Sequence, residues 1–518
     1  MGNICEGWLQ VLRSWILKRR SAMPSQPVAE VRAIVETVPG DPPTPERVRA
    51  VLWLADRLKD AGRPGEGLPL TEEATRLSEL LGDPGLRTDA LTQSALVLSA
   101  LGRDDEAFAA LTRATEIAQG LELRWRSDIE IASTVVTWAA GRDDESVAAC
   151  RRGVELTGGD RPGALPGKWG IRNLNLAEGL LEAGDWEEAA RLIDRVLGTP
   201  DMSAFISGWA DRLGWHLTAW TGDLSPTGWQ YDGSDDPGWS DIEVGEIQNI
   251  LSNRWTRADV AAVTGHVDVV RETLRPVLQQ PLCAQAPEFL WPILEVAARV
   301  EADVRQRRIA QGAVDGGASH SVVDAVAGLV ELMPPRNPRD ATFAANVSAD
   351  LARCEGVEDV RAWTEVVQGW RQEGHPHRVG WTSLRLAEAA VSQEDRVLAR
   401  DALLEALSVA RTLGARPLAE AVGALAHRHR ITLPATTRAS TDSGPLGLTE
   451  RELQVLALLA DGSSNQEIAT RLFISPKTAS VHVSHILAEL GVTTRTHAAA
   501  VAHRSGLAEP RADDPATV

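Results

Sequence analysis

Residues 448–507 read LTERELQVLALLADGSSNQEIATRLFISPKTASVHVSHILAELGVTTRTHAAAVAHRSGL, and this stretch predicts four short helices. The first helix opens at a capping box, in which Thr449 is followed three positions later by Glu452. Leucines then recur at helical spacing until the helix stops at Asp461-Gly462.

The second helix opens at another capping box, formed by Ser464 and Glu467. It carries the small Ala469, which permits the close approach that two steeply crossing helices need. The third helix has Ser475 as its cap and ends at Gly491. Two helices joined by a tight turn in this way predict a helix-turn-helix module.

The third helix has two faces of different chemistry. The inward face is apolar and comprises Ala479, Val483, Ile486, Leu487 and Leu490. The outward face carries Lys477, Ser480, Val481 and Ser484. A helix with small polar side chains in its N-terminal half can enter the major groove of DNA, and its N-terminus suits a phosphate.

Several motifs in this stretch resemble the C-terminal DNA-binding domain of LuxR-type transcription regulators. These are LTERELQVL, the G-x-S-N-x-E-I-A run from Gly462, ISPKT-x-x-VH and LGV-x-x-R, which agree in register without a gap. The resemblance implies base contacts by Ser480, Val481 and Ser484. It implies phosphate contacts by Lys477, Thr478, His485 and Arg495, and a homodimer formed through the fourth helix, residues 494–505.

Two positions depart from that family pattern. Ala479 stands where Val is more usual, and Glu489 stands where Lys is common, which removes one expected phosphate contact. The stretch from Leu446 to Leu507 has five Lys or Arg (451, 471, 477, 495, 504) and five Asp or Glu (450, 452, 461, 467, 489). A neutral monomer should bind a polyanion weakly, so we expect dimerisation to be needed.

The composition of the whole chain limits the possible functions. Its 518 residues carry a formal charge of −19, which argues against a protein that coats nucleic acid. The four cysteines are far apart and form no C-x-x-C pair, as expected for a reducing cytoplasm. The opening 20 residues contain an apolar run followed by basic residues. In a secretory signal the basic residues come before the apolar run. We interpret this segment either as an over-long gene start, with Met23 the true initiator, or as a helix at a membrane surface. We expect no helix that spans a membrane.

The body of the chain predicts an all-α array of tetratricopeptide-like helical repeats. A Gly-x-x-x-E-Ala pattern recurs, with small anchor residues at Gly67, Ala107, Ser146 and Ala189 spaced 40, 39 and 43 positions apart. Paired helices need small residues where they cross and a glycine between them to turn. The arrays built from such pairs bind peptides, proteins or small ligands, so this region is the expected effector region.

Residues 44–430 also resemble the helical-repeat part of the large ATP-binding regulators of the LuxR family, notably at 290–304 and 381–420. Those regulators begin with an ATP-binding domain, and no Gly-x-x-x-x-Gly-Lys-Ser/Thr occurs here. The nearest approach, residues 163–169, has the wrong spacing and is predicted to be a loop. We therefore expect no nucleotide cofactor, although a separate ATPase could be a partner.

Two further features outside the repeats could bind ligands. Residues 222–246 interrupt the array and combine Trp229, Tyr231 and Trp239 with six acidic residues between Asp232 and Glu246, which suggests either an acidic loop or a site for a sugar or cation. His375-Pro376-His377 could suggest a metal pair, but without nearby Cys or His it predicts an inter-helix turn and no metal site.

The sequence thus predicts a cytoplasmic, nucleoid-associated transcription regulator with no catalytic residues. The alternative is a repeat-based interaction adaptor whose C-terminal module does not act on DNA. The expected segments are an N-terminal extension (1–43), helical repeats (44–431), a Pro/Ser/Thr-rich linker (432–446), the helix-turn-helix domain (447–509) and a polar tail (510–518).

Overall fold

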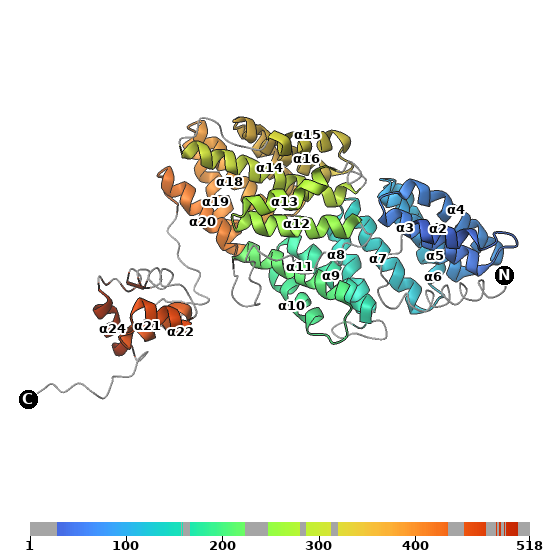
Figure 1. The fold of residues 1–518 in the computed structure, drawn as a ribbon, viewed down its shortest axis with the longest axis horizontal. Coiled ribbons are helices and arrows are strands. Elements are labelled where there is room, and N and C mark those ends of the chain that lie inside the picture. The colour runs from blue at the N-terminus through green and yellow to red at the C-terminus, as the bar shows by residue number, and fades with distance from the viewer. Residues whose placement is uncertain are drawn as a thin grey trace, which may run out of the picture. The chain divides into compact units, whose positions relative to one another are not determined.

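The computed structural model describes residues 28–156, 158, 166–222, 247–279, 286–311, 320–433, 450–472, 483, 486, 487, 490, 492 and 494–505. Within these ranges every regular element is a helix and no strand occurs, which confirms the all-α class (Figure 1). The chain divides into two compact units, unit 1 (Met1–Leu433) and unit 2 (Pro434–Val518). No helix in the described ranges is long and apolar enough to cross a membrane.

The described part of unit 1 consists of helices that follow one another along the chain. The first ten are α2 (Val28–Glu36), α3 (Pro45–Asp60), α4 (Pro64–Leu81), α5 (Pro84–Ala100), α6 (Asp104–Ala118), α7 (Leu123–Ala139), α8 (Asp143–Leu156), α9 (Pro166–Ala183), α10 (Trp186–Leu197) and α11 (Ala204–Thr221). The others are α12 (Ile247–Val263), α13 (Val267–Leu278), α14 (Pro287–Ala310), α15 (His320–Leu332), α16 (Pro338–Glu355), α17 (Val360–Gln372), α18 (Pro376–Ser392), α19 (Arg396–Leu413) and α20 (Arg416–Arg428).

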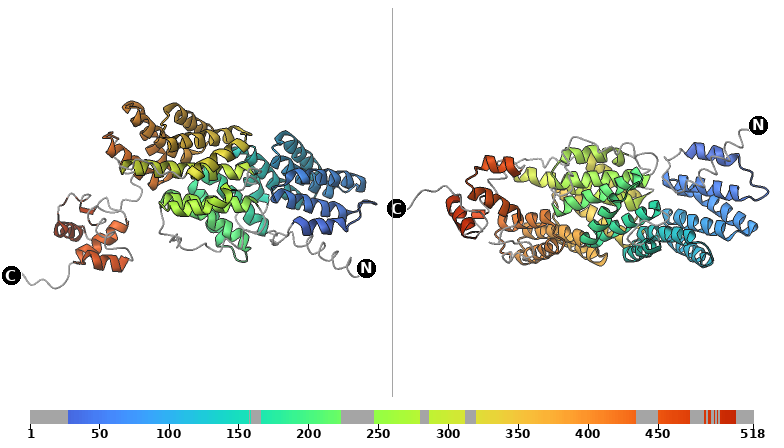
Figure 2. Two further views of the ribbon diagram at one scale, coloured as in Figure 1. Left: turned by 45° about the horizontal axis from the view of Figure 1, so that its top comes forward. Right: turned by 90° about the horizontal axis from the view of Figure 1, so that it is seen from below.

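These helices pack as successive pairs. The pairs are α3 with α4, α5 with α6, α7 with α8, α9 with α10, and α18 with α19 (Figure 2). The first helices of neighbouring pairs also contact each other, because α5 packs against both α3 and α7. Stacked helix pairs bury a continuous core that no single pair could form alone. The tetratricopeptide-like character of the pairs stays a prediction.

The glycine turns and small anchors predicted from the sequence are present. Gly62, Gly102, Gly141 and Gly184 all have positive φ, between 70° and 85°, a conformation that costs glycine nothing. All four anchors are buried. At Gly67, a Cβ would lie 3.2 Å from the carbonyl oxygen of Ala55 in the neighbouring helix. The anchors are therefore small because helices cross there.

We call helices α7–α11 of unit 1 the first layer and helices α16–α20 the second layer. The two layers contact each other through the turns at the ends of their helices. Asn337 donates to the carbonyl of Ala139 at 3.1 Å, and Arg416 donates to the carbonyl of Thr221 at 3.2 Å. Between these contacts, a Cβ on Gly184 would lie 2.6 Å from Cγ of Pro376. We call this contact region the junction; its residues are 138–143, 182–184, 221, 222, 337–339, 375–378, 416 and 417.

Several local expectations need correction. Helix α2 lies within residues 1–43, predicted as an N-terminal helix or extension, and buries Val31 against the core it shares with α3. Residues 166–169, predicted to be part of a loop, begin helix α9: Lys168 pairs with Asp128, and Trp169 is fully buried. The predicted turn at 375–377 is only partly a turn, because α18 begins at Pro376.

Other predicted segments lie outside the described residues. They are most of the interrupting segment, with Trp229, Tyr231 and Trp239, most of the linker (434–446) and the tail (510–518). Trp186, at the start of α10, is a core residue: its side chain is 5% exposed and its indole N–H donates to the carbonyl of Leu181.

Candidate nucleic-acid interface

Unit 2 is a small helical domain with its own apolar core. Its described helices are α21 (Glu450–Ala460), α22 (Asn465–Leu472) and α24 (Arg495–Arg504), and α21 packs against both of the others. The buried side chains of the core are Val455, Leu456, Leu459, Ile468, Ala469, Val483, Ile486, Ala498 and Ala502. Ala469 is only 3% exposed, consistent with its predicted place at a close helix crossing.

The turn between α21 and α22 has the geometry that the sequence predicts. Gly462 has a φ of +82°, and the N–H of Ser463 donates to the carbonyl of Leu458 at 3.0 Å. The N–H of Ser464 donates to Oε2 of Glu467 at 2.7 Å, and the N–H of Glu467 donates to Oγ of Ser464 at 3.3 Å. This is a reciprocal capping box, and it fixes the first turn of α22.

The hydrogen bonds of the capping box also act on its carboxylate. The backbone N–H and the hydroxyl of Ser464 both donate to Glu467, and they lower the pKa of this carboxyl below its ordinary value. The negative charge lies at the N-terminal end of α22, where the helix dipole favours it. In the first helix Glu452 is 5% exposed; its predicted partner Thr449 lies outside the described residues.

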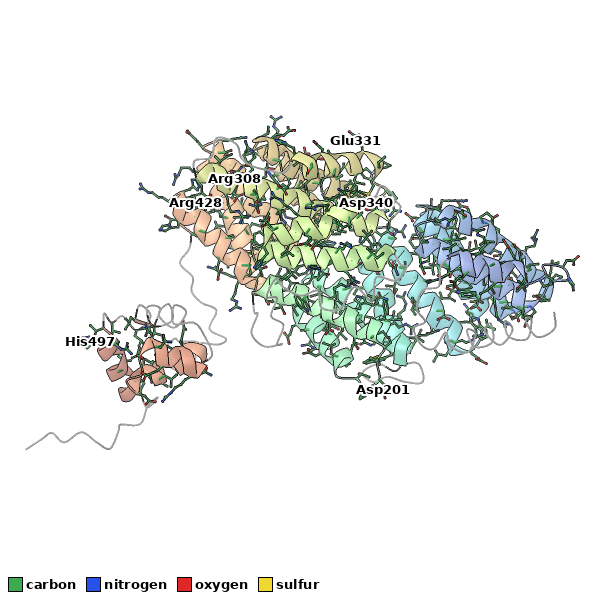
Figure 3. All side chains as sticks on the ribbon, viewed as in Figure 1. Asp201, Arg308, Glu331, Asp340, Arg428 and His497 are labelled. Atoms are coloured by element: carbon green, nitrogen blue, oxygen red, sulfur yellow. The ribbon has the colours of Figure 1, made fainter. Side chains whose placement is uncertain are left out.

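Arg495 links two parts of the domain. Its Nη2 donates to the carbonyl of Ser463 at 2.6 Å, so the first residue of α24 is tied to the turn between α21 and α22. Thr494 caps the same helix by accepting from the N–H of His497 at 3.3 Å; the side chain of His497 lies at the surface (Figure 3). No local pattern predicts the Arg495 contact, because the partners are 32 positions apart. The guanidinium stays exposed and keeps further donors for a phosphate.

The predicted third helix is described at Val483, Ile486, Leu487 and Leu490. Val483 and Ile486 are buried, and Leu487 and Leu490 pack against the same core, as predicted for the inward face. The N–H of Val492 donates to the carbonyl of Leu487 at 2.9 Å, the bond that closes a helix C-terminus. The four described positions of the inward face therefore lie in the core of unit 2, as predicted.

The remaining predicted positions lie outside the described residues. They are Lys477, Thr478, Ser480, Val481, Ser484 and His485 of the reading face and Gly491 at its end. Their contacts with DNA stay predictions. In the described part of the chain, no group of three His, Cys, Asp or Glu side chains is placed to hold a metal ion.

Three described helices around one apolar core, a glycine turn after the first and a capping box at the second agree with the small helical domain that the sequence predicts. Residues 446–502 match the family described as "Bacterial regulatory proteins, luxR family". The C-terminal unit therefore contains a LuxR-family DNA-binding domain.

Three similar proteins illustrate the match. The chain is 50% identical over 60 residues to the transcriptional regulatory protein LiaR of Bacillus subtilis (strain 168), covering 12% of this chain and 28% of that one. It is 42% identical over 69 residues to the DNA-binding transcriptional activator DevR/DosR of Mycobacterium tuberculosis (strain ATCC 25618 / H37Rv), covering 13% and 32%. It is 50% identical over 60 residues to the response regulator VraR of Staphylococcus aureus (strain Mu3 / ATCC 700698), covering 12% and 29%.

The chain thus spans about a third or less of the length of these relatives, and only its C-terminal part is similar to them. Among solved structures, Ton1535 from Thermococcus onnurineus NA1 aligns with 80% of this chain and 99% of its own, at 12% identity and a TM-score of 0.26. That score is too low to indicate a shared fold.

Proposed function

We propose that this protein is a cytoplasmic transcription regulator that binds double-stranded promoter DNA through unit 2, as a homodimer, and responds to a protein or small-molecule effector through unit 1. The observation that carries the proposal is the LuxR-family match at residues 446–502, in a unit whose described helices pack around one apolar core. The relatives that share this domain are named as transcriptional regulators. No catalytic role is proposed.

The reading face is proposed on the third helix. Ser480, Val481 and Ser484 would contact base edges, while Lys477, Thr478, His485 and Arg495 would contact phosphates. Burial of Val483 and Ile486 supports this orientation. If these two side chains face the core, positions on the opposite side of the same helix face outward.

The effector part of the proposal is supported by a groove in unit 1. It has a volume of about 410 Å³ and runs between α6, α7 and α8, where Phe108, Leu111, Thr115, Thr137 and Arg152 contribute to its lining. Sites for small molecules typically measure about 300–1,000 Å³ and combine apolar walls with a few polar groups. A second, more enclosed cavity near the junction measures only about 50 Å³ and is too small for such a ligand.

The alternative function is a protein-interaction adaptor. It is favoured by the equal numbers of acidic and basic residues in the domain and by Glu489 at a position where Lys is common. Salt dependence separates the two functions, because a DNA-binding protein releases counterions in proportion to the phosphates it contacts. We would titrate the full-length protein against labelled DNA from its own upstream region at several salt concentrations, with a scrambled duplex as competitor.

Lys477→Ala tests the proposed phosphate contact. It should weaken binding to all duplexes and reduce the slope of log K against log salt by about one, because one phosphate contact is lost. Arg428→Ala is the matched control: it removes one positive charge from an exposed position on α20 of unit 1 (Figure 3) and should leave the slope unchanged. Ser484→Ala should change sequence preference instead. If the wild-type protein shows no salt-dependent, sequence-specific retention, the adaptor function is favoured.

A further inference from the structure

A continuous chain of charged side chains crosses the junction of unit 1. The first layer contributes Asp143 of α8 and Glu182 of α9. The second layer contributes Arg339 of α16, Arg378 of α18 and His375, the residue immediately before α18. The ion-pair partners His375 and Glu182 are 193 positions apart, and His375 and Asp143 are 232 apart. These pairs therefore join the two layers and do not stabilise single helices.

His375 lies at the centre of this chain and contacts both carboxylates. Its Nδ1 is 2.9 Å from Oε2 of Glu182, and its Nε2 is 2.8 Å from Oδ2 of Asp143. Ionised carboxylates only accept hydrogen bonds, so both ring nitrogens must carry a proton. A neutral imidazole would direct a nitrogen lone pair at a carboxylate oxygen in a site where His375 is only 5% exposed.

The groups around His375 are arranged for the imidazolium. Arg339 donates to the other oxygen of Asp143 at 2.7 Å, and Nε of Arg378 lies 3.6 Å from the same oxygen of Glu182 that contacts the imidazole. The two guanidiniums and the imidazolium face the two carboxylates together with the half-buried Glu373 at the end of α17. The indole of Trp370 covers the imidazole, with ring centroids 5.4 Å apart. Removal of one proton from His375 would leave the carboxylates in excess.

We propose that His375 is a pH-sensitive latch between the two layers of unit 1, and that the junction opens when the imidazolium loses its second proton. The latch is a property of unit 1 alone, so it holds or fails independently of the proposed binding of DNA.

The direction of the pH effect follows from the two carboxylates. Hydrogen bonds from His375 to Asp143 and Glu182 outweigh burial and raise the pKa of the imidazole above its ordinary value of about 6.5. The pKa of His375 is therefore higher in the closed junction than its ordinary value of about 6.5. The imidazolium stabilises the closed junction fully below about pH 6.5, and this stabilisation is lost as the pH rises from there through the raised pKa. The junction should therefore be closed in mildly acidic solution and should open in alkaline solution.

Hydrogen exchange of the full-length protein between about pH 6 and pH 9.5 tests the proposal. Protection of peptides covering 138–143, 182–184 and 375–380 would be expressed relative to peptides from α3 and α5, which removes the intrinsic pH dependence of exchange. In the wild-type protein this ratio should fall by up to about tenfold per pH unit above pH 6.5 and then level off. A ratio that does not change with pH would overturn the proposal.

Three variants separate the latch from a structural role. Asp143→Asn supplies an amide that can donate to a neutral imidazole and still accept from Arg339, so the junction should stay protected at every pH. His375→Gln should lose protection at low pH, and His427→Gln, an exposed position on α20, should behave as wild type. A pH-dependent fall that persists unchanged in Asp143→Asn would refute the latch, even if His375→Gln fails to fold.

Discussion

Gly184→Ala tests the contact between the two layers of unit 1. Gly184 has a φ of +85° and is the turn between α9 and α10. An added Cβ would lie 2.6 Å from Cγ of Pro376 and 2.9 Å from Cδ2 of Leu413, both in the second layer. Left-handed backbone costs a non-glycine residue about 1–2 kcal/mol, and forcing a methyl into a filled space costs about 1–3 kcal/mol. The free energy of unfolding of unit 1 should therefore fall by about 2–5 kcal/mol.

A matched control removes the backbone contribution. Gly414 has a φ of +68°, and nothing lies within 4 Å of a Cβ added there, so Gly414→Ala should incur only the conformational cost. The difference between the two variants, about 1–3 kcal/mol, measures the clash between layers. Urea unfolding followed by tryptophan fluorescence and by circular dichroism would give both values and would reveal an intermediate if the probes disagree. Equal destabilisation by the two substitutions would refute the contact between Gly184 and Pro376.

Two more predictions concern local chemistry. Ser464→Ala removes one half of the capping box and should destabilise unit 2 by about 0.5–2 kcal/mol without affecting unit 1; melting followed separately for the two units would check this, and an equal shift in both would contradict it. Burial raises the pKa of Cys150 to about 11. Because the thiolate is the reactive form, Cys150 in the native protein should be alkylated at pH 8 more than about a hundredfold more slowly than in urea; peptide mass spectrometry measures this, and comparable rates would show that the thiol is accessible and ionised.

The helix-turn-helix domain and the repeat pairs were predictable because their signals are local. Ser464 and Glu467 are three positions apart, and each glycine turn precedes its small anchor by a few residues along the same chain segment. Such patterns depend on backbone conformation and on the spacing of one helix surface, both of which the sequence displays directly. The same locality explains why the buried face of the third helix, with Val483 and Ile486, was predicted correctly.

The junction could not be predicted from the sequence. His375-Pro376-His377 has the local character of a turn, and nothing near it indicates that His375 contacts Asp143, 232 positions away. His377 gave no better signal. It is half-buried beside Trp220, its Nε2 accepts from the indole N–H of Trp381 at 3.0 Å, and desolvation lowers its pKa to about 3. Two histidines separated by a single proline thus have pKa values shifted in opposite directions, which depends on neighbours brought together only by the fold.

The polar contacts of the junction determine how the layers are aligned, whereas apolar burial supplies the force that brings them together. A single apolar cluster runs from Cys150 to Ile431 and includes residues of both layers. Burial of apolar surface is not directional, so by itself it would tolerate several alignments. The hydrogen bonds of Asn337, Arg339 and His375 are satisfied in only one of them. An ion-pair network adds little net stability over an apolar contact, yet loss of one partner costs about 3–5 kcal/mol. Change at the junction should therefore be abrupt, which is the behaviour that a switch between two states of unit 1 requires.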